Sequence, residues 1–79
     1  MKTYRLIIRN RDRLLGHFES STPWSLEAIK ETASRFPARD GYRLELLVSH
    51  GEKRLIESTP EGIRVLSSEL LFEPAPLDN

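Results

Sequence analysis

The chain has 79 residues, with 12 basic and 12 acidic side chains and a formal net charge of zero. It has no cysteine, which excludes disulfides and thiolate metal ligands and agrees with a reducing cytoplasm. No apolar run approaches the roughly 20 residues that span a bilayer, and no cleavable leader is visible, so we expect a soluble protein without membrane contact. This length predicts one small domain at residues 1–73 and a disordered tail at 74–79.

Alternating apolar residues predict a β-hairpin at the start of the chain. In residues 3–9, tyrosine, leucine and isoleucine alternate with other residues, a period of two that is typical of a strand with one buried face. A turn at 10–12 leads to a second strand at 13–20, in which Gly16 indicates a bulge.

A helix is predicted over residues 23–36. Thr22 can cap it, Pro23 suits its first turn, and Pro37 ends it. Trp24 is expected to cover the edge of the core. Apolar residues at three- and four-residue spacing predict one buried stripe: Leu26, Ile29, Ala33 and Phe36.

The second half of the chain predicts another hairpin. Residues 42–48 alternate like the first strand, and a turn at 49–52 leads to a strand at 53–58. Residues 60–71 allow two alternatives, a second helix or a turn followed by a short strand. Gly62 and the β-branched residues favour the strand.

The two predicted hairpins nearly repeat each other. Residues 4–23 and 42–60 both begin with Tyr-Arg-Leu, restart with Arg-Leu and end near Thr-Pro, through duplication or through a shared hairpin pattern. A helix over 23–36 spans about 21 Å and returns the chain to its starting end. We therefore predict an α+β fold, ββαββ in two layers, with an antiparallel four-stranded sheet in the order 2-1-3-4 and the helix on one face.

Charge is distributed unevenly along the chain. Residues 1–20 hold five basic and two acidic side chains, and residues 60–79 hold one basic and four acidic side chains. The first hairpin carries a basic cluster that either contacts a phosphate backbone or an acidic protein, or only solubilises the strands: Arg5, Arg9, Arg11 and Arg13. Zero net charge makes nucleic acid the less favoured partner.

An apolar cluster near the C-terminus is the second candidate contact. It either closes the core of its own chain or contacts a protein partner or a second copy: Leu66, Leu70, Leu71 and Phe72.

No set of residues predicts catalysis, a metal site or a cofactor. His17 and His50 have no third ligand at metal-binding spacing. A set of Ser49, His50 and Asp40 lacks any nucleophile motif around it. Strand carboxylates are expected to form cross-strand ion pairs with arginines: Glu19, Glu45 and Glu57.

The chain resembles small uncharacterised bacterial proteins of the cytoplasm. The segment Glu-Ser-Thr-Pro-Glu-Gly-Ile-Arg-Val-Leu at residues 57–66 carries this resemblance, which implies no activity for any residue. We expect a cytoplasmic, non-enzymatic interaction or accessory protein, with a homodimer as one form of that interaction. The alternative is a nucleic-acid-binding module that uses the basic first hairpin.

Overall fold

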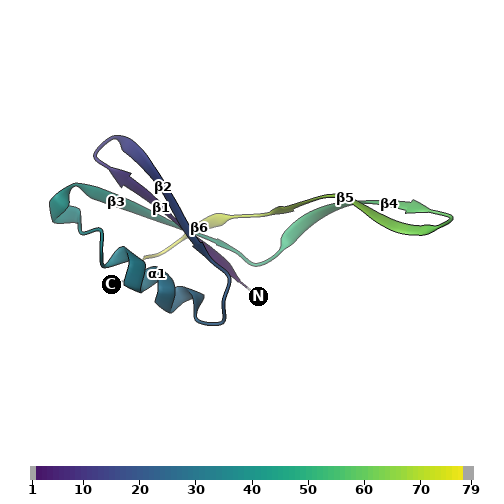
Figure 1. The fold of residues 1–79 in the computed structure, drawn as a ribbon, viewed down its shortest axis with the longest axis horizontal. Coiled ribbons are helices and arrows are strands. Elements are labelled where there is room, and N and C mark those ends of the chain that lie inside the picture. The colour runs from purple at the N-terminus through teal and green to yellow at the C-terminus, as the bar shows by residue number, and fades with distance from the viewer. Residues whose placement is uncertain (1, 78–79) are drawn as a thin grey trace.

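A computed structural model describes residues 2–77, and the side chains of all of these except 52–57 and 65–69. Figure 1 shows a body made of a sheet and a helix, from which a two-stranded hairpin projects. The elements in chain order are β1 (Thr3–Asn10), β2 (Arg13–Ser20), α1 (Ser25–Ala33), the 3-10 helix η1 (Ala38–Asp40), β3 (Tyr42–Ser49), β4 (Glu52–Thr59), β5 (Gly62–Leu70) and β6 (Glu73–Ala75).

The body is an antiparallel sheet in the order β2-β1-β3-β6, with α1 on one face (Figure 1). The predicted α+β class, the four-stranded antiparallel sheet and the central β1–β3 pair are confirmed. Leu6 and Leu46 lie opposite each other in that pair, and both are buried against the helix residue Ile29. The core is small because it occupies only the sheet face under α1.

The fourth position in the sheet belongs to β6 and not to residues 53–58. β3 does not turn at residues 49–52 but continues into β4, which pairs with β5. The β4–β5 pairing continues the β3–β6 pairing, because the two registers differ by no more than one residue. Residues 46–75 therefore form one long, interrupted ribbon that turns at Pro60-Glu61, because proline there fixes a backbone angle suited to a turn.

The segment after Thr59 is thus a strand, longer than expected. The helix α1 is shorter than predicted, since Trp24 and not Thr22 is its N-cap, and Thr22 instead accepts the Ser25 N–H in a preceding turn at 3.0 Å. Its end tightens at residues 34–36, where Phe36 donates to the carbonyl oxygen of Ala33 at 3.0 Å. The predicted apolar stripe is buried at Ile29 and Ala33, whereas Leu26 and Trp24 are 40% and 61% exposed.

The expectation of a disordered tail at 74–79 needs a correction. Pro74 and Ala75 lie in β6 opposite Leu47 and Leu46, and Leu77 packs against the core cluster. Residues 78 and 79 lie outside the described chain. The sequence did not predict this strand because Pro74 lies within it and Pro76 follows it, and proline is normally depleted in strands.

Candidate interaction surfaces

β4 and β5 form the projecting hairpin, which is a separate two-stranded sheet. Among the described elements, its strands pair only with each other, and the body makes no extensive contact with them. At its base, the Leu71 N–H donates to the Gly51 carbonyl oxygen at 3.4 Å. The molecule is consequently elongated, with principal extents of 59 × 27 × 15 Å.

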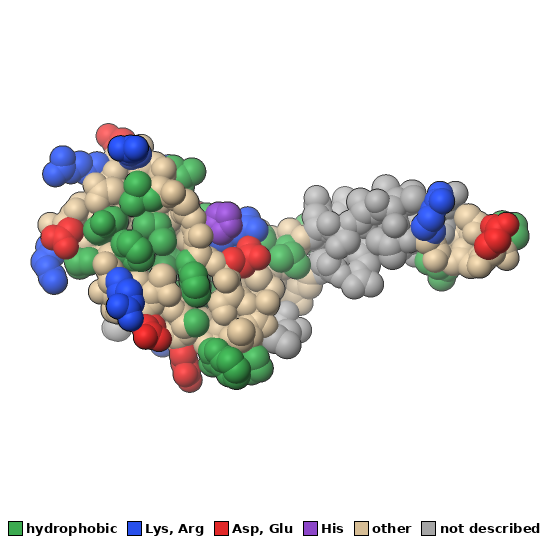
Figure 2. All heavy atoms as spheres, in the orientation of Figure 1, with side chains coloured by type: hydrophobic (Ala, Val, Ile, Leu, Met, Phe, Trp, Pro, Cys, Tyr) green, Lys and Arg blue, Asp and Glu red, His purple; other side chains and the backbone are tan. Residues whose placement is uncertain are grey.

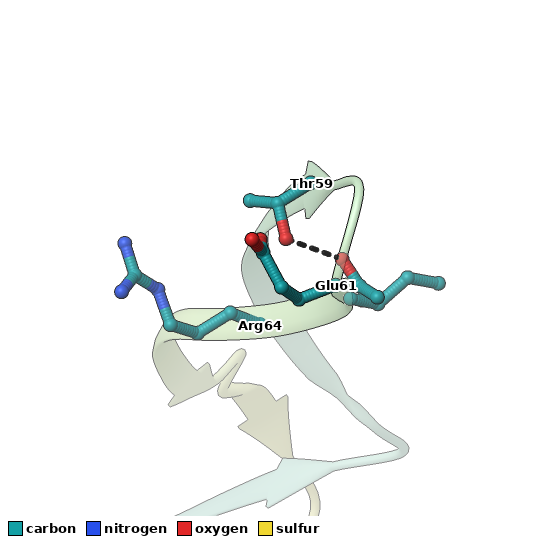
Figure 3. Close-up of a pocket in the computed structure, with 5 residues that line it drawn as sticks. Thr59, Glu61 and Arg64 are labelled. Carbon is teal, nitrogen blue, oxygen red and sulfur yellow. Dashed lines mark hydrogen bonds between the residues drawn. The ribbon is translucent and has the colours of Figure 1, made fainter.

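The tip of the projecting hairpin is a tight turn closed by a side chain. The Thr59 hydroxyl donates to the Gly62 carbonyl oxygen at 3.1 Å. Figure 3 shows Glu61 pointing toward Thr59, whereas the guanidinium of Arg64 extends away from them. A hollow of about 250 Å³ lies beside these residues. Ile63 is 73% exposed, the largest exposed fraction among the large apolar side chains described.

The predicted apolar cluster lies at the base of the projecting hairpin. Leu70 and Leu71 are 38% and 55% exposed, and the side chain of Leu66 lies outside the described residues. Phe72 is half-buried, with the Arg5 guanidinium carbon 4.1 Å from its ring centroid. Phe72 therefore packs within its own chain, whereas Leu70 and Leu71 are exposed.

Three of the four predicted arginines gather at the end of the body opposite the hairpin. The β1–β2 turn lies against the loop before β3, because the Arg11 N–H donates to the Gly41 carbonyl oxygen at 2.8 Å. The β1–β3 register adds Arg43 opposite Arg9, and η1 adds Arg39. We name this set the arginine end: Arg9, Arg11, Arg13, Arg39 and Arg43. Figure 2 shows basic side chains around this end.

Arg5 does not belong to the arginine end. Its Nη2 and Nε atoms lie 2.7 and 2.9 Å from Glu19 Oε1, and its other neighbour is Phe72. Glu19 is the cross-strand partner of Arg5 in the sheet, as expected for strand charges. This arginine is therefore committed to an internal ion pair. Glu45 is exposed, and the side chain of Glu57 is not described.

The other polar candidates are not brought together. Ser49 is buried and its hydroxyl donates to the Gly51 carbonyl oxygen, whereas Asp40 precedes the opposite end of β3. His50 Nε2 lies 3.3 Å from Glu73 Oε1, and His17 is exposed on β2. No group of three metal-ligating side chains occurs among the described residues.

An apolar hollow of about 470 Å³ lies between the end of α1 and β3. Its apolar lining includes Ala33, Phe36, Tyr42, Leu44 and Leu77. The Phe36 and Tyr42 rings meet edge to face with centroids 5.1 Å apart. The hollow exists because α1 packs on β1 and β2, which leaves part of β3 uncovered.

None of the protein families, curated proteins or solved structures compared with this chain matches it. The resemblance to small bacterial cytoplasmic proteins therefore stays a prediction. Within residues 2–77, no helix has the length and apolar character that crossing a bilayer requires.

Proposed function

We propose that this chain is a non-enzymatic, cytoplasmic protein-interaction module whose projecting hairpin is the contacting element. The observation that carries the proposal is the hairpin itself, which extends β3 and β6 beyond the body as two strands alone. An isolated two-stranded hairpin is at best marginally stable in water. A partner that adds a strand or covers a face supplies the missing contacts.

Exposed apolar side chains at both ends of the projecting hairpin support a protein partner. Ile63 stands at the tip, and Leu70 and Leu71 stand at the base. Apolar residues of this kind form the buried centre of protein interfaces, with charged residues at the rim. A second copy of the chain is one such partner and gives a homodimer.

The absence of cysteine allows a direct test by site-specific cross-linking. Ile63→Cys carries a photoactivatable maleimide at the tip, and Ser34→Cys, an exposed position after α1, carries it in the matched control. We expect the tip to cross-link to one defined protein or to a second copy, with the control cross-linking to neither. Equal, diffuse cross-linking from both positions contradicts the proposal.

Hydrogen exchange provides the independent measurement. In dilute isolated protein, the amides of β4 and β5 should exchange much faster than those of β1, because no other element supports them. Added partner should slow them selectively. Hairpin amides that are as protected as those of β1 in a dilute monomer would show that the hairpin needs no partner.

A further inference from the structure

The arginine end concentrates positive charge on a chain of zero net charge. All five of its arginines are exposed, and none forms an ion pair within the part of the chain that the structure describes. The nearby carboxylates are Asp12 in the β1–β2 turn, Asp40 in η1, and Glu45, which lies two residues after Arg43 on the same face of β3. This end therefore has a local formal charge of about +2, five arginines against three carboxylates.

The β1–β3 register places two of these charges directly opposite each other. Arg9 and Arg43 are cross-strand partners in the antiparallel pair. Like charges at such positions disfavour the sheet, since their side chains project on the same face only about 5 Å apart. An anion that contacts both guanidiniums removes this repulsion.

An open hollow lies at the same end. It has a volume of about 460 Å³ and is lined by Arg11, Asp12, Ala38, Gly41, Tyr42 and Arg43. The two cations come from different elements, and the Arg11–Gly41 backbone hydrogen bond holds those elements together. The hollow is thus lined by two arginines, one from the β1–β2 turn and one from β3.

We propose that the arginine end binds the phosphate backbone of a nucleic-acid strand, with phosphate groups bridging Arg9, Arg11 and Arg43. Every cation of this end is an arginine, although the chain also has three lysines. The planar guanidinium matches the oxygens of a phosphate in a bidentate manner, which the lysine ammonium cannot do. The surface is open and spans four elements, β1, β2, η1 and β3, which suits a polymer that passes over it.

This proposal does not rest on the projecting hairpin, which lies at the other end of the molecule (Figure 1). It also differs from the expectation drawn from the first hairpin alone. Arg5 takes no part, and Arg39 and Arg43 enter from the second half of the chain.

Salt dependence of binding tests the proposal quantitatively. The probe is a fluorescein-labelled 20-nucleotide single-stranded DNA. Its fluorescence anisotropy gives the binding constant at salt concentrations from about 25 to about 300 mM. Because Arg9 and Arg43 share one phosphate, the five arginines contact four phosphates, which predict a slope of log K against log salt of about −2.8. The double variant R9Q/R43Q should lower the slope to about −2 and weaken binding at 50 mM salt by roughly tenfold or more.

Two matched variants separate this surface from its alternatives. K2Q removes an exposed cation beside the start of β1, whereas Arg9 lies near the other end of that strand, and it should leave binding unchanged. Leu14 and Leu15 are 56% and 52% exposed beside Arg13, and an acidic protein partner would use them. Leu14→Ser with Leu15→Ser should leave DNA affinity unchanged, and polyglutamate should not displace the DNA.

Three results would overturn the proposal. One is no binding of wild-type protein at 25 mM salt, a measurement that requires no variant to fold. A second is an equal loss in K2Q and R9Q/R43Q, which would indicate diffuse charge. The third is displacement of DNA by polyglutamate together with dependence on Leu14 and Leu15, which would identify an acidic protein as the ligand.

Discussion

Residues 4–23 and 42–60 share a Tyr-Arg-Leu start, a later Arg-Leu pair and a Thr-Pro end, yet they have different structures. The first copy closes as the β1–β2 hairpin, in which Arg13 pairs with Asn10. The second copy runs from β3 into β4 without closing, and its two strands belong to different sheets. Shared side-chain alternation therefore specifies strands in both copies, whereas turn chemistry and distant partners decide which strands pair.

The largest expected difference between the copies concerns their matching leucines. Leu6→Ala removes a fully buried side chain from the centre of the core and should cost about 2–5 kcal/mol of unfolding free energy. Leu44→Ala should cost about half as much, because Leu44 is half-buried beside the apolar hollow. Urea denaturation followed by circular dichroism measures both values, and equal losses would mean that the copies contribute equally to the core.

The single glycine in each copy gives the next comparison. Gly16 lies at the β1–β2 bulge with φ +150°, so Gly16→Ala should destabilise by more than about 1 kcal/mol. Gly51 is outside the positive-φ region and has open space around it, so Gly51→Ala should stabilise by about 0.4–1 kcal/mol. Thermal denaturation measures whether each substitution lowers or raises the stability. Destabilisation by Gly51→Ala would indicate that a turn forms at residues 49–52 in solution.

The two arginines of the Tyr-Arg-Leu segments differ in their partners. Arg5→Ala removes a half-exposed ion pair and a ring contact, and after solvent screening it should cost about 1 kcal/mol. Arg43→Ala should change stability by less than about 0.5 kcal/mol.

Urea denaturation at low salt and at about 0.5 M salt measures these effects and isolates their electrostatic part. The Arg5 effect should shrink with salt, because salt screens its ion pair with Glu19. A larger loss from Arg43→Ala than from Arg5→Ala would reverse the assignment of which arginine is structural.

Removing the projecting hairpin should have the smallest effect on the body. Replacing residues 53–69 by Asn-Gly connects Glu52 to its cross-strand partner Leu70 through a favourable two-residue turn. The core residues lie elsewhere, so the unfolding free energy should change by less than about 0.5 kcal/mol. Denaturation followed by Trp24 fluorescence measures it. A loss above about 2 kcal/mol would mean that the hairpin supports the sheet.

Most elements of the body could be predicted from side-chain alternation and from the residues that favour turns and helix ends. Alternation gave β1, β2 and β3, and the length of the predicted helix placed β1 beside β3. The sequence contains two turn signals, Ser49-His50-Gly51 and Pro60-Glu61-Gly62, and local pattern alone does not choose between them. β6 was missed because a three-residue strand with a central proline has no measurable period.

The sequence also predicted only part of the arginine end, because two of its arginines join it through long-range contacts. Arg9, Arg11 and Arg13 are close in sequence, so their proximity required only the first hairpin. Arg39 and Arg43 join them through the β1–β3 register and the Arg11–Gly41 hydrogen bond, which are long-range features. Arg5 was included because strand alternation places it with Arg9, and its ion pair with Glu19 became visible only in three dimensions.

The short strand β6 also decides how copies of this molecule can associate. It is the outer edge of the sheet beside β3, and Glu73-Pro74-Ala75-Pro76 contains two residues without a backbone N–H. A charged, proline-containing edge cannot offer the ladder of donors that another strand needs. This side of the sheet is thus protected from edge-to-edge aggregation, and growth of a continuous sheet through β6 is blocked at its first step.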